Sequence, residues 1–322
     1  MRRLSAGLLL AATFIAPILA TPLLAQPATP KAVLVTGAST GIGRRITELL
    51  AARGYFVYAG ARKPEDLAAL SRIPNVQGIR LDVTVPAEIA AAVETVEKAG
   101  RGLHGLVNNA GVAVIEPLIE IDEQDLAFQM DVNVMGPYRV TKAFSRLLIA
   151  SKGRIVTTGS LSGFVAGPLS GPYSMSKHAV EAFTDALAAE MARFGVKVSV
   201  VEPGNYKSEI GKTLQTRMRA KGKSYDASAF QQEMKRFQDG AAIGSNDPEP
   251  DDVAEATLHA LSDPNPKLRY LVVPNQRQAD LTIRKVLTVA AQLNQGHRYS
   301  YSRDSLVAML DQVLARVGGA AR

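Results

Sequence analysis

A short apolar strand that runs into three closely spaced glycines constrains this chain more than any other feature. Residues 31–43 read KAVLVTGASTGIG, and a helical pattern follows over 44–53. Gly37 can take a positive φ for a sharp exit from the strand, while Gly41 and Gly43 leave backbone N–H groups bare at a helix N-terminus, where an anion is favoured. The turn therefore predicts a diphosphate site, although such a turn standing alone also closes strands for purely structural reasons.

Short β-rich runs alternate with helical patterns along residues 31–273. Strands are expected at 32–36, 54–59, 76–81, 104–107, 153–158, 196–201 and 268–273, and helices over 42–52, 86–99, 121–148, 173–194 and 250–261. This alternation predicts an α/β fold, a doubly wound (Rossmann-type) parallel sheet of seven strands with helices on both faces. The loops at the carboxyl ends of the strands then form one crevice, where functional residues are expected.

Composition excludes several kinds of chemistry. The 322 residues include no cysteine, which rules out thiol nucleophiles and thiolate sites, and the four histidines lack ligand spacing, so no metal site is expected. The net charge is +7, and residues 207–236 contribute eight basic and three acidic side chains. We interpret that segment as a solvated helical face or an anion-attracting surface, without a nucleic-acid module. Catalysis must use hydroxyls, lysines, carboxylates and a cofactor.

The loops after the second and third strands bear on which cofactor is used. NAD enzymes usually carry an acid about 20 residues beyond the glycines, whereas residues 59–63 here read AGARK. The Arg62 guanidinium suits a 2′-phosphate, which favours NADP(H) over NAD(H), with a solvated loop arginine as the alternative. Asp82 either accepts a hydrogen bond from an adenine amino group or caps the helix that begins near Pro86.

Polar residues also follow the fourth and fifth strands. Residues 108–111 read NNAG, in which the asparagines can tie strand ends together and Gly111 lets the backbone pass close to a cofactor, unless this is a plain turn. The fifth strand ends at Thr158, Gly159 and Ser160.

A tyrosine and a lysine share one face of the next helix, because Lys177 follows Tyr173 by four residues. Bringing a phenol pKa from about 10 to about 7 needs roughly 4 kcal/mol. One positive charge about 4 Å away supplies about that much at an effective dielectric of about 20. Tyr173 is therefore expected to relay protons. Taken alone, the spacing of Tyr173 and Lys177 is also typical of an ordinary amphipathic helix.

Taken in order, these motifs resemble the short-chain dehydrogenase/reductase family in its standard single-domain form. The resemblance covers about residues 31–273 and rests on TGASTGIG (36–43), NNAG (108–111), Asn133 in DVNVMG, Ser160 in TTGS, Tyr173 and Lys177 in YSMSK, and Pro203-Gly204. It implies an NAD(P)-dependent enzyme in which hydride moves between a nicotinamide and the CH–OH carbon of a substrate.

The resemblance also implies residue roles. Tyr173 is the implied general acid/base, Ser160 bonds the substrate oxygen, Lys177 lowers the tyrosine pKa and holds the ribose, and Asn133 supports a water relay to Lys177. Thr40 stands where NADP-dependent members may carry a basic residue, so Arg62 is left as the main phosphate contact. Ser208 replaces a frequent threonine. The implied cofactor contacts are Gly37, Ser39, Gly41, Ile42, Gly43, Arg62, Asp82, Asn109, Ala110, Gly111, Tyr173, Lys177, Pro203, Gly204 and Ser208.

Residues 205–244 lie where the family has a substrate lid. Apolar side chains there predict a small hydrophobic ketone, aldehyde or alcohol as substrate, with a subunit contact as the alternative use; they are Met218, Tyr225, Phe230, Met234 and Phe237. The competing function is a cofactor-binding scaffold or sensor of the same fold with little catalysis. The complete set of Asn133, Ser160, Tyr173 and Lys177 argues against it.

Both ends of the chain extend beyond this core. Residues 1–30 have a basic start, an apolar run over 4–25 and then small residues, which is the layout of a signal peptide; an uncleaved membrane anchor is one alternative. We expect an exported or membrane-anchored protein, or a cytoplasmic one if the start codon is misassigned. Residues 274–322 predict amphipathic helices over 279–293 and 305–317 that cover the pocket, a neighbouring subunit or a membrane. A homodimer or homotetramer is expected.

Overall fold

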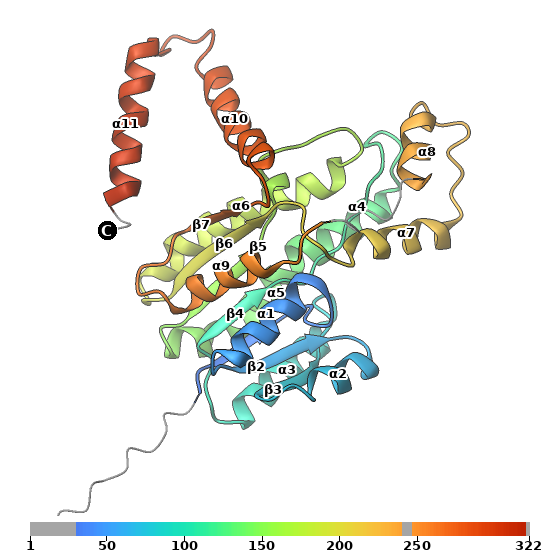
Figure 1. Cartoon of the computed structure of the whole chain (residues 1–322), viewed down its shortest axis with the longest axis vertical. Helices are drawn as coiled ribbons and strands as arrows, with labels where there is room; N and C mark the ends of the chain where they lie inside the picture. Colours follow the sequence, from blue (N-terminus) through green and yellow to red (C-terminus); the bar gives the residue numbers. More distant parts are fainter. Residues whose placement is uncertain (1–29, 240–246, 320–322) are drawn as a thin grey trace, which may run out of the picture.

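A parallel sheet of seven strands forms the centre of the computed structural model, which describes residues 30–239 and 247–319 (Figure 1). In the described residues the strand order is β3-β2-β1-β4-β5-β6-β7, and every pairing is parallel. The expected signal or anchor segment, except residue 30, lies outside the described residues. The strands are β1 (Ala32–Val35), β2 (Phe56–Ala61), β3 (Val76–Arg80), β4 (Gly105–Asn108), β5 (Arg154–Thr158), β6 (Lys197–Pro203) and β7 (Arg269–Val272).

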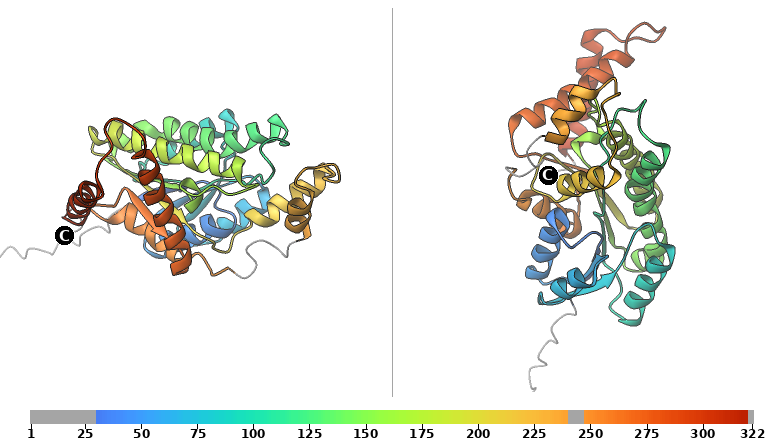
Figure 2. Two further views of the ribbon diagram at one scale, coloured as in Figure 1. Left: turned by 90° about the horizontal axis from the view of Figure 1, so that it is seen from above. Right: turned by 90° about the vertical axis from the view of Figure 1, so that its right-hand side faces the viewer.

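Helices cover both faces of the sheet, which Figure 2 shows from above. One face packs against α1 (Gly41–Ala52), α2 (Pro64–Leu70) and α9 (Asp251–Ser262). The other packs against α3 (Pro86–Lys98), α5 (Gly136–Ala150) and α6 (Gly171–Ala192). Because the central strands are buried on both sides, they read as continuous apolar runs rather than alternating ones; all of β1 is at most 1% exposed. The doubly wound α/β prediction is confirmed.

The strand order reverses between β1 and β4, which places the crevice of an open α/β sheet at the carboxyl ends of these strands. Every expected strand is present, and both of its ends lie within two residues of the expected bounds. A further short helix, α2, begins at Pro64 and has Glu65 and Asp66 in its first turn, as expected from the proline and the two acids.

The helix expected over 121–148 is interrupted. It consists of α4 (Glu123–Met130), a π-helical turn (Asp131–Met135) and α5. Such turns inside α-helices recur at functional sites, and this one contains Asn133. Gly136 at its end packs so closely on Val83 that a Cβ there would lie 2.7 Å from a valine methyl. The interruption therefore fits a polar contact of Asn133 and the packing of α5 on the sheet.

Two pairs of helices lie outside the sheet layers. The lid region contains α7 (Ile210–Lys221) and α8 (Gln231–Asp239), and residues 240–244 of the expected lid lie outside the described residues. The C-terminal extension contains α10 (Gln276–Leu293) and α11 (Arg303–Gly319), which stand away from the body (Figures 1 and 2). A search of the described residues finds no helix that combines the length and apolar character needed to span a bilayer.

Candidate active site

The glycine turn brings three segments of the chain into very close contact. Gly37 has φ +64°, and a Cβ on it would lie 2.9 Å from Ala110 Cα. A Cβ on Gly43 would lie 2.2 Å from the Gly37 carbonyl oxygen and 2.3 Å from Asn109 Nδ2. Protein packing alone therefore demands glycine at 43, in addition to any need for room beside a diphosphate. Half-buried Ser39 and Ile42 belong to the same turn.

Asn109 ties the ends of three strands together. Its Nδ2 donates to the carbonyl oxygens of Thr36 and Gly37, both at 3.1 Å, and its Oδ1 accepts from Thr158 Oγ1 at 3.3 Å. Thr36 Oγ1 in turn accepts from the backbone N–H groups of Asn109 and Ala110, both at 3.0 Å. Both polar atoms of the Asn109 side chain are thus hydrogen-bonded within the protein. Sequence reasoning missed Thr36, although a threonine at the end of a buried strand was a usable signal.

Gly111 and Ser208 lie beside this turn in different ways. A Cβ on Gly111 would meet no atom closer than 3.5 Å, so packing within the protein does not require glycine at this position. The glycine leaves open space there. A Cβ on Gly41 would lie 3.2 Å from Ser208 Cα, which places the start of the lid against the glycine turn. The Pro203-Gly204 end of β6 leads into this segment, and the Asn205 N–H donates to Gln278 Oε1 at 2.9 Å.

Ser160, Tyr173 and Lys177 converge after β5. Ser160 precedes a short 3₁₀ turn (Leu161–Gly163), where its Oγ accepts from the Ser162 N–H at 3.1 Å, and its side chain also interacts with the Tyr173 phenol. Lys177, which is 7% exposed, donates from Nζ to the Thr158 carbonyl oxygen at 2.8 Å. That Nζ lies 5.7 Å from the centre of the Tyr173 ring. The one-face prediction for the tyrosine and lysine is confirmed.

Desolvation controls the protonation of these groups in the chain by itself. Burial raises the pKa of Tyr173 above its usual 10, and the Ser160 interaction offsets only part of the rise. Burial also lowers the pKa of Lys177 to about 8, against the opposing effect of the Glu202 and Glu181 carboxylates. The direction for the tyrosine is opposite to our expectation, because the sequence argument counted the lysine charge and omitted the loss of water.

Asn133 acts as a clamp on the segment that follows NNAG. Its Oδ1 accepts from the Val112 N–H at 2.9 Å, and its Nδ2 donates to the Val112 carbonyl oxygen and to Ser176 Oγ, both at 3.0 Å. Gln129 makes a parallel pair, accepting from the Val114 N–H at 2.6 Å and donating to the Val112 carbonyl oxygen at 3.0 Å. The implied water relay stays a prediction. Gln129 and Ser176 carried no recognisable sequence signal.

A buried carboxyl pair lies behind the lysine. Glu202 on β6 is 1% exposed, and Glu181 on α6 accepts from Arg269 Nε at 3.0 Å. Burial and the negative charge of Glu181 raise the pKa of Glu202 to about 9. Strongly perturbed groups of this kind concentrate at functional sites. Neither glutamate was predicted from the sequence.

Arg62 and Asp82 meet at the ends of β2 and β3. Arg62 Nη1 lies 3.8 Å from Asp82 Oδ2, and the arginine side chain is 64% exposed. Asp82 Oδ1 accepts from both the N–H and the hydroxyl of Thr84, at 2.9 and 2.7 Å. The helix-capping interpretation of Asp82 is wrong, because the residue that precedes α3 is Val85 and Asp82 instead closes a local turn. The exposed guanidinium is free to meet a further anion.

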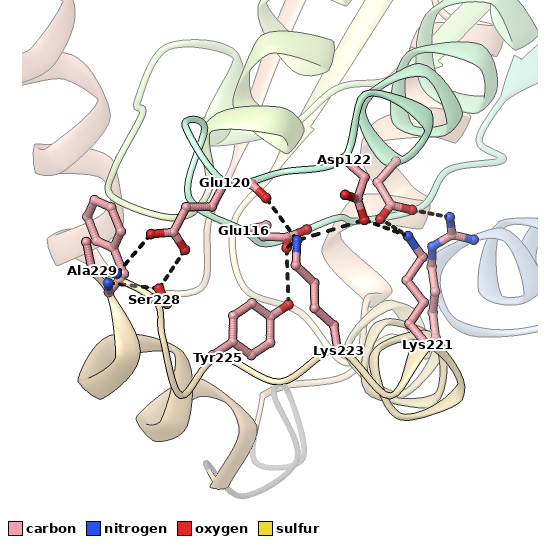
Figure 3. Close-up of polar contacts among 11 residues, drawn as sticks. Glu116, Glu120, Asp122, Lys221, Lys223, Tyr225, Ser228 and Ala229 are labelled. Carbon is pink, nitrogen blue, oxygen red and sulfur yellow. Dashed lines mark hydrogen bonds and ion pairs between the residues drawn. The ribbon is translucent and has the colours of Figure 1, made fainter.

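Ion pairs between buried carboxylates and partly exposed basic side chains fasten the lid region to residues 114–125 (Figure 3). Asp125 is 2% exposed and pairs with Arg217 at 2.5 Å and with Lys221. Glu116 is 3% exposed, pairs with Lys223 and accepts from Tyr225 Oη at 3.3 Å. The basic surplus of this region is therefore partly used inside the protein, which neither sequence interpretation foresaw. Glu116 and Asp125 were also missed.

Apolar groups lie beside these pairs. Met234 and Tyr225 of the expected cover are buried, and Met218 lines a pocket under α7. The apolar residues of that pocket also include Val114, Ile115 and Leu214. The lid thus combines an apolar lining with charged attachment points.

Comparison with known proteins identifies relatives of one kind. Residues 31–219 match the family model described as short chain dehydrogenase. The chain is 34% identical over 268 residues to mitochondrial D-beta-hydroxybutyrate dehydrogenase of Rattus norvegicus, with 76% of this chain and 78% of that protein covered. It is 36% identical over 253 residues to NADPH-dependent 3-dehydrocapnine reductase of Ornithobacterium rhinotracheale, covering 76% and 88%.

Solved structures with the same fold contain either cofactor. A short-chain dehydrogenase/reductase of Burkholderia phymatum in complex with NAD superposes with a TM-score of 0.70 at 26% identity, covering 85% of this chain and 98% of that one. A short-chain dehydrogenase of Burkholderia cenocepacia in complex with NADP gives 0.63 at 26% identity, covering 82% and 95%. Similarity of the backbone therefore does not discriminate between the two cofactors.

The packing at the glycine turn predicts the effect of one methyl group. Gly43→Ala places a Cβ against backbone atoms that cannot turn aside, so the free energy of unfolding is expected to fall by about 1–3 kcal/mol. Gly111→Ala is the matched control and should stay within about 0.5 kcal/mol of the parent. Denaturant unfolding measures both; equal effects would contradict the crowding at position 43.

Proposed function

The chain belongs to the short-chain dehydrogenase/reductase family and is an NAD(P)-dependent oxidoreductase acting on CH–OH groups, and we propose that it uses NADP(H) on a hydrophobic ketone, aldehyde or alcohol. The observation that carries the proposal is the convergence of the Tyr173 phenol, the Ser160 hydroxyl and buried Lys177 at the end of β5, beside the glycine turn. A weakly acidic phenol next to a hydroxyl suits proton transfer at a carbonyl or alcohol oxygen.

The residues present fit a dinucleotide. The glycine turn leads into the N-terminus of α1, where backbone N–H groups and the helix dipole favour a diphosphate, and Gly111 leaves open space nearby. Lys177 would hold the ribose hydroxyls. The nicotinamide, when bound, supplies or accepts the hydride.

The chain's own residues then handle the proton and the substrate oxygen. In reduction, Tyr173 Oη donates its proton to the oxygen while Ser160 Oγ donates a hydrogen bond to it; in oxidation, Tyr173 accepts the proton. Tyr173 carries its proton at neutral pH, as the acid role requires, but burial makes it a weaker acid than an exposed phenol, so stabilisation of the phenolate has to come from its neighbours. The Lys177 ammonium lies on the same side of α6 and favours the phenolate that remains after the proton has left.

Arg62 supports NADP(H). Its guanidinium is mostly exposed, stands at the end of β2 and has only the 3.8 Å contact to Asp82 Oδ2 among the ion pairs of the described residues. A planar, permanently charged donor group suits a phosphate. The apolar lining of the lid, including Met218 and Leu214, supports a hydrophobic substrate.

Removal of the Tyr173 hydroxyl distinguishes the proposed enzyme from the competing function, a cofactor-binding scaffold with little catalysis. Tyr173→Phe removes the proton donor, so turnover on carbonyl substrates should fall about 10²–10⁴-fold while NADPH affinity is retained. Absorbance of the reduced nicotinamide measures turnover, and fluorescence titration measures binding. Tyr299→Phe, at an exposed tyrosine, should change neither quantity. Unaltered turnover of Tyr173→Phe would remove the assigned mechanism.

Cofactor choice is tested at Arg62. Arg62→Gln should weaken NADPH binding about 10- to 100-fold, which corresponds to loss of a charge-assisted hydrogen bond, and leave NADH binding unchanged. Arg72→Gln, at an exposed arginine nearby in sequence, serves as the control. Equal weakening of both cofactors by Arg62→Gln would exclude a specific contact with the 2′-phosphate.

The lowered pKa of Lys177 predicts a pH dependence. The ammonium is lost as pH rises through about 8, well before an exposed lysine loses its proton. NADPH affinity should therefore be highest on the acid side of that value and decline above it. A fluorescence titration across this range checks the profile, and Lys177→Met should abolish that step and bind more weakly throughout. An unchanged step in Lys177→Met would assign the titration to another group.

A further inference from the structure

The C-terminal arm, defined here as residues 276–319, is held to the body only near its start. Gln278 accepts from the Asn205 N–H, and Thr282 is 2% exposed. From residue 283 to residue 317 no side chain that the structure describes is buried, and Figures 1 and 2 show α10 and α11 projecting from the body. The arm is thus two well-formed helices whose side chains have almost no protein around them.

Each helix of the arm carries an apolar stripe with the spacing used for packing against another helix. Residues recur at alternating intervals of four and three along α10, namely Ala279, Ile283, Val286, Ala290 and Leu293, and along α11, namely Leu306, Leu310, Val313 and Val317. An average interval of 3.5 residues keeps a stripe facing a partner helix. The polar residues lie on the opposite sides, including Lys285 and Gln292 on α10 and Asp311 and Gln312 on α11.

The positions that flank each stripe are apolar as well. Leu287 and Val289 lie on either side of the α10 stripe, and Val307, Met309 and Leu314 flank the α11 stripe. In two-stranded coiled coils these flanking positions are usually charged. A helix that packs against two neighbouring helices in a bundle needs a wider apolar face. Each arm helix is therefore suited to meet more than one other helix.

The exposed area is sufficient for a stable contact. Large apolar side chains on these faces are between 36% and 73% exposed: Ile283, Val286, Leu287, Val289, Leu293, Val307, Met309, Leu310, Val313, Leu314 and Val317. At roughly 90 Å² for each side chain when fully exposed, they present about 500 Å² of apolar surface per copy. Two copies would bury up to about 1,000 Å² before polar flanks are counted, which reaches the lower bound for a biological interface.

The charges of α11 favour a second copy over a bilayer. Amphipathic helices that lie on membranes have a basic polar face; α11 balances Arg303 and Arg316 with Asp304 and Asp311, although α10 carries more basic than acidic residues. The stripes of α10 and α11 have the same spacing, so the arm is complementary to itself across a twofold axis, the commonest symmetry of soluble oligomers.

We propose that the arm is a self-association element: the α10 and α11 stripes of two copies pack together as a four-helix bundle. This contact lies outside the sheet layers and is independent of the proposed function. It gives the C-terminal extension one of the three uses that the sequence left open.

Sedimentation of the full chain tests the proposal. Val286→Asp combined with Leu310→Asp places charges on both stripes and should lower the mass of the complex about twofold. The matched control, Thr288→Asp combined with Gln312→Asp, places the same charges on the polar sides and should leave the mass unchanged. Circular dichroism should show equal thermal unfolding of the body in all three proteins. An unchanged mass in the stripe variant, or an equal fall in both variants, would overturn the proposal.

Cross-linking provides a second measurement, helped by the absence of native cysteine. A chain with Ala290→Cys and Leu310→Cys should be joined to a second copy by a short bismaleimide, because helices in a bundle lie about 8–10 Å apart. Gln292→Cys with Gln312→Cys should give only collisional product. Equal yields would contradict the bundle. Sedimentation with phosphatidylcholine–phosphatidylglycerol vesicles that is lost in the aspartate stripe variant, without a change of mass in solution, would assign the arm to lipid instead.

Discussion

The close approach of three backbone segments at the glycine turn is the constraint on which the rest of the site depends. Only the absence of a side chain at Gly43 lets the turn, the end of β1 and Asn109 fit together. Asn109 also holds Thr158 at the end of β5, and the Thr158 carbonyl oxygen accepts from Lys177. The proposed nucleotide site and Lys177 are therefore parts of one hydrogen-bonded structure, and displacement of either would affect the other.

Removal of water sets the chemistry of this crevice. Burial raises the pKa of Tyr173, lowers that of Lys177 to about 8 and, with Glu181, raises that of Glu202 to about 9. All three changes favour the neutral forms, because a charge loses more hydration on burial than a neutral group does. A phenol that stays protonated at neutral pH has a proton to donate. A lysine with a lowered pKa changes its charge nearer to neutral pH than an exposed lysine does, so a nearby anion can shift its protonation.

The lid is attached through the same segment that the site uses. Residues 112–114 are clamped by Asn133 and Gln129, and the chain continues to Glu116, which pairs with Lys223 of the lid region. A buried carboxylate left without its partner is costly, so the loss of Lys223 or Arg217 would destabilise the attachment of the lid region. The segment clamped by Asn133 and Gln129 and the attachment of the lid region are thus parts of one continuous stretch of chain. The C-terminal arm lies outside it and offers its apolar faces to another molecule.

Much of the fold and part of the site followed from local pattern. The strands, their order along the chain, the glycine turn and the shared face of Tyr173 and Lys177 are properties of residues close together in sequence, and periodicity and turn chemistry encode them. The π-helical turn at Asn133, the approach of Arg62 to Asp82, the Glu116 and Asp125 ion pairs and the Tyr173 pKa were decided by tertiary structure. Asn133 bonds a residue 21 positions away, Lys223 pairs with one 107 positions away, and the pKa depends on how much water the folded protein removes. No local pattern reports contacts of that range or the desolvation that accompanies them.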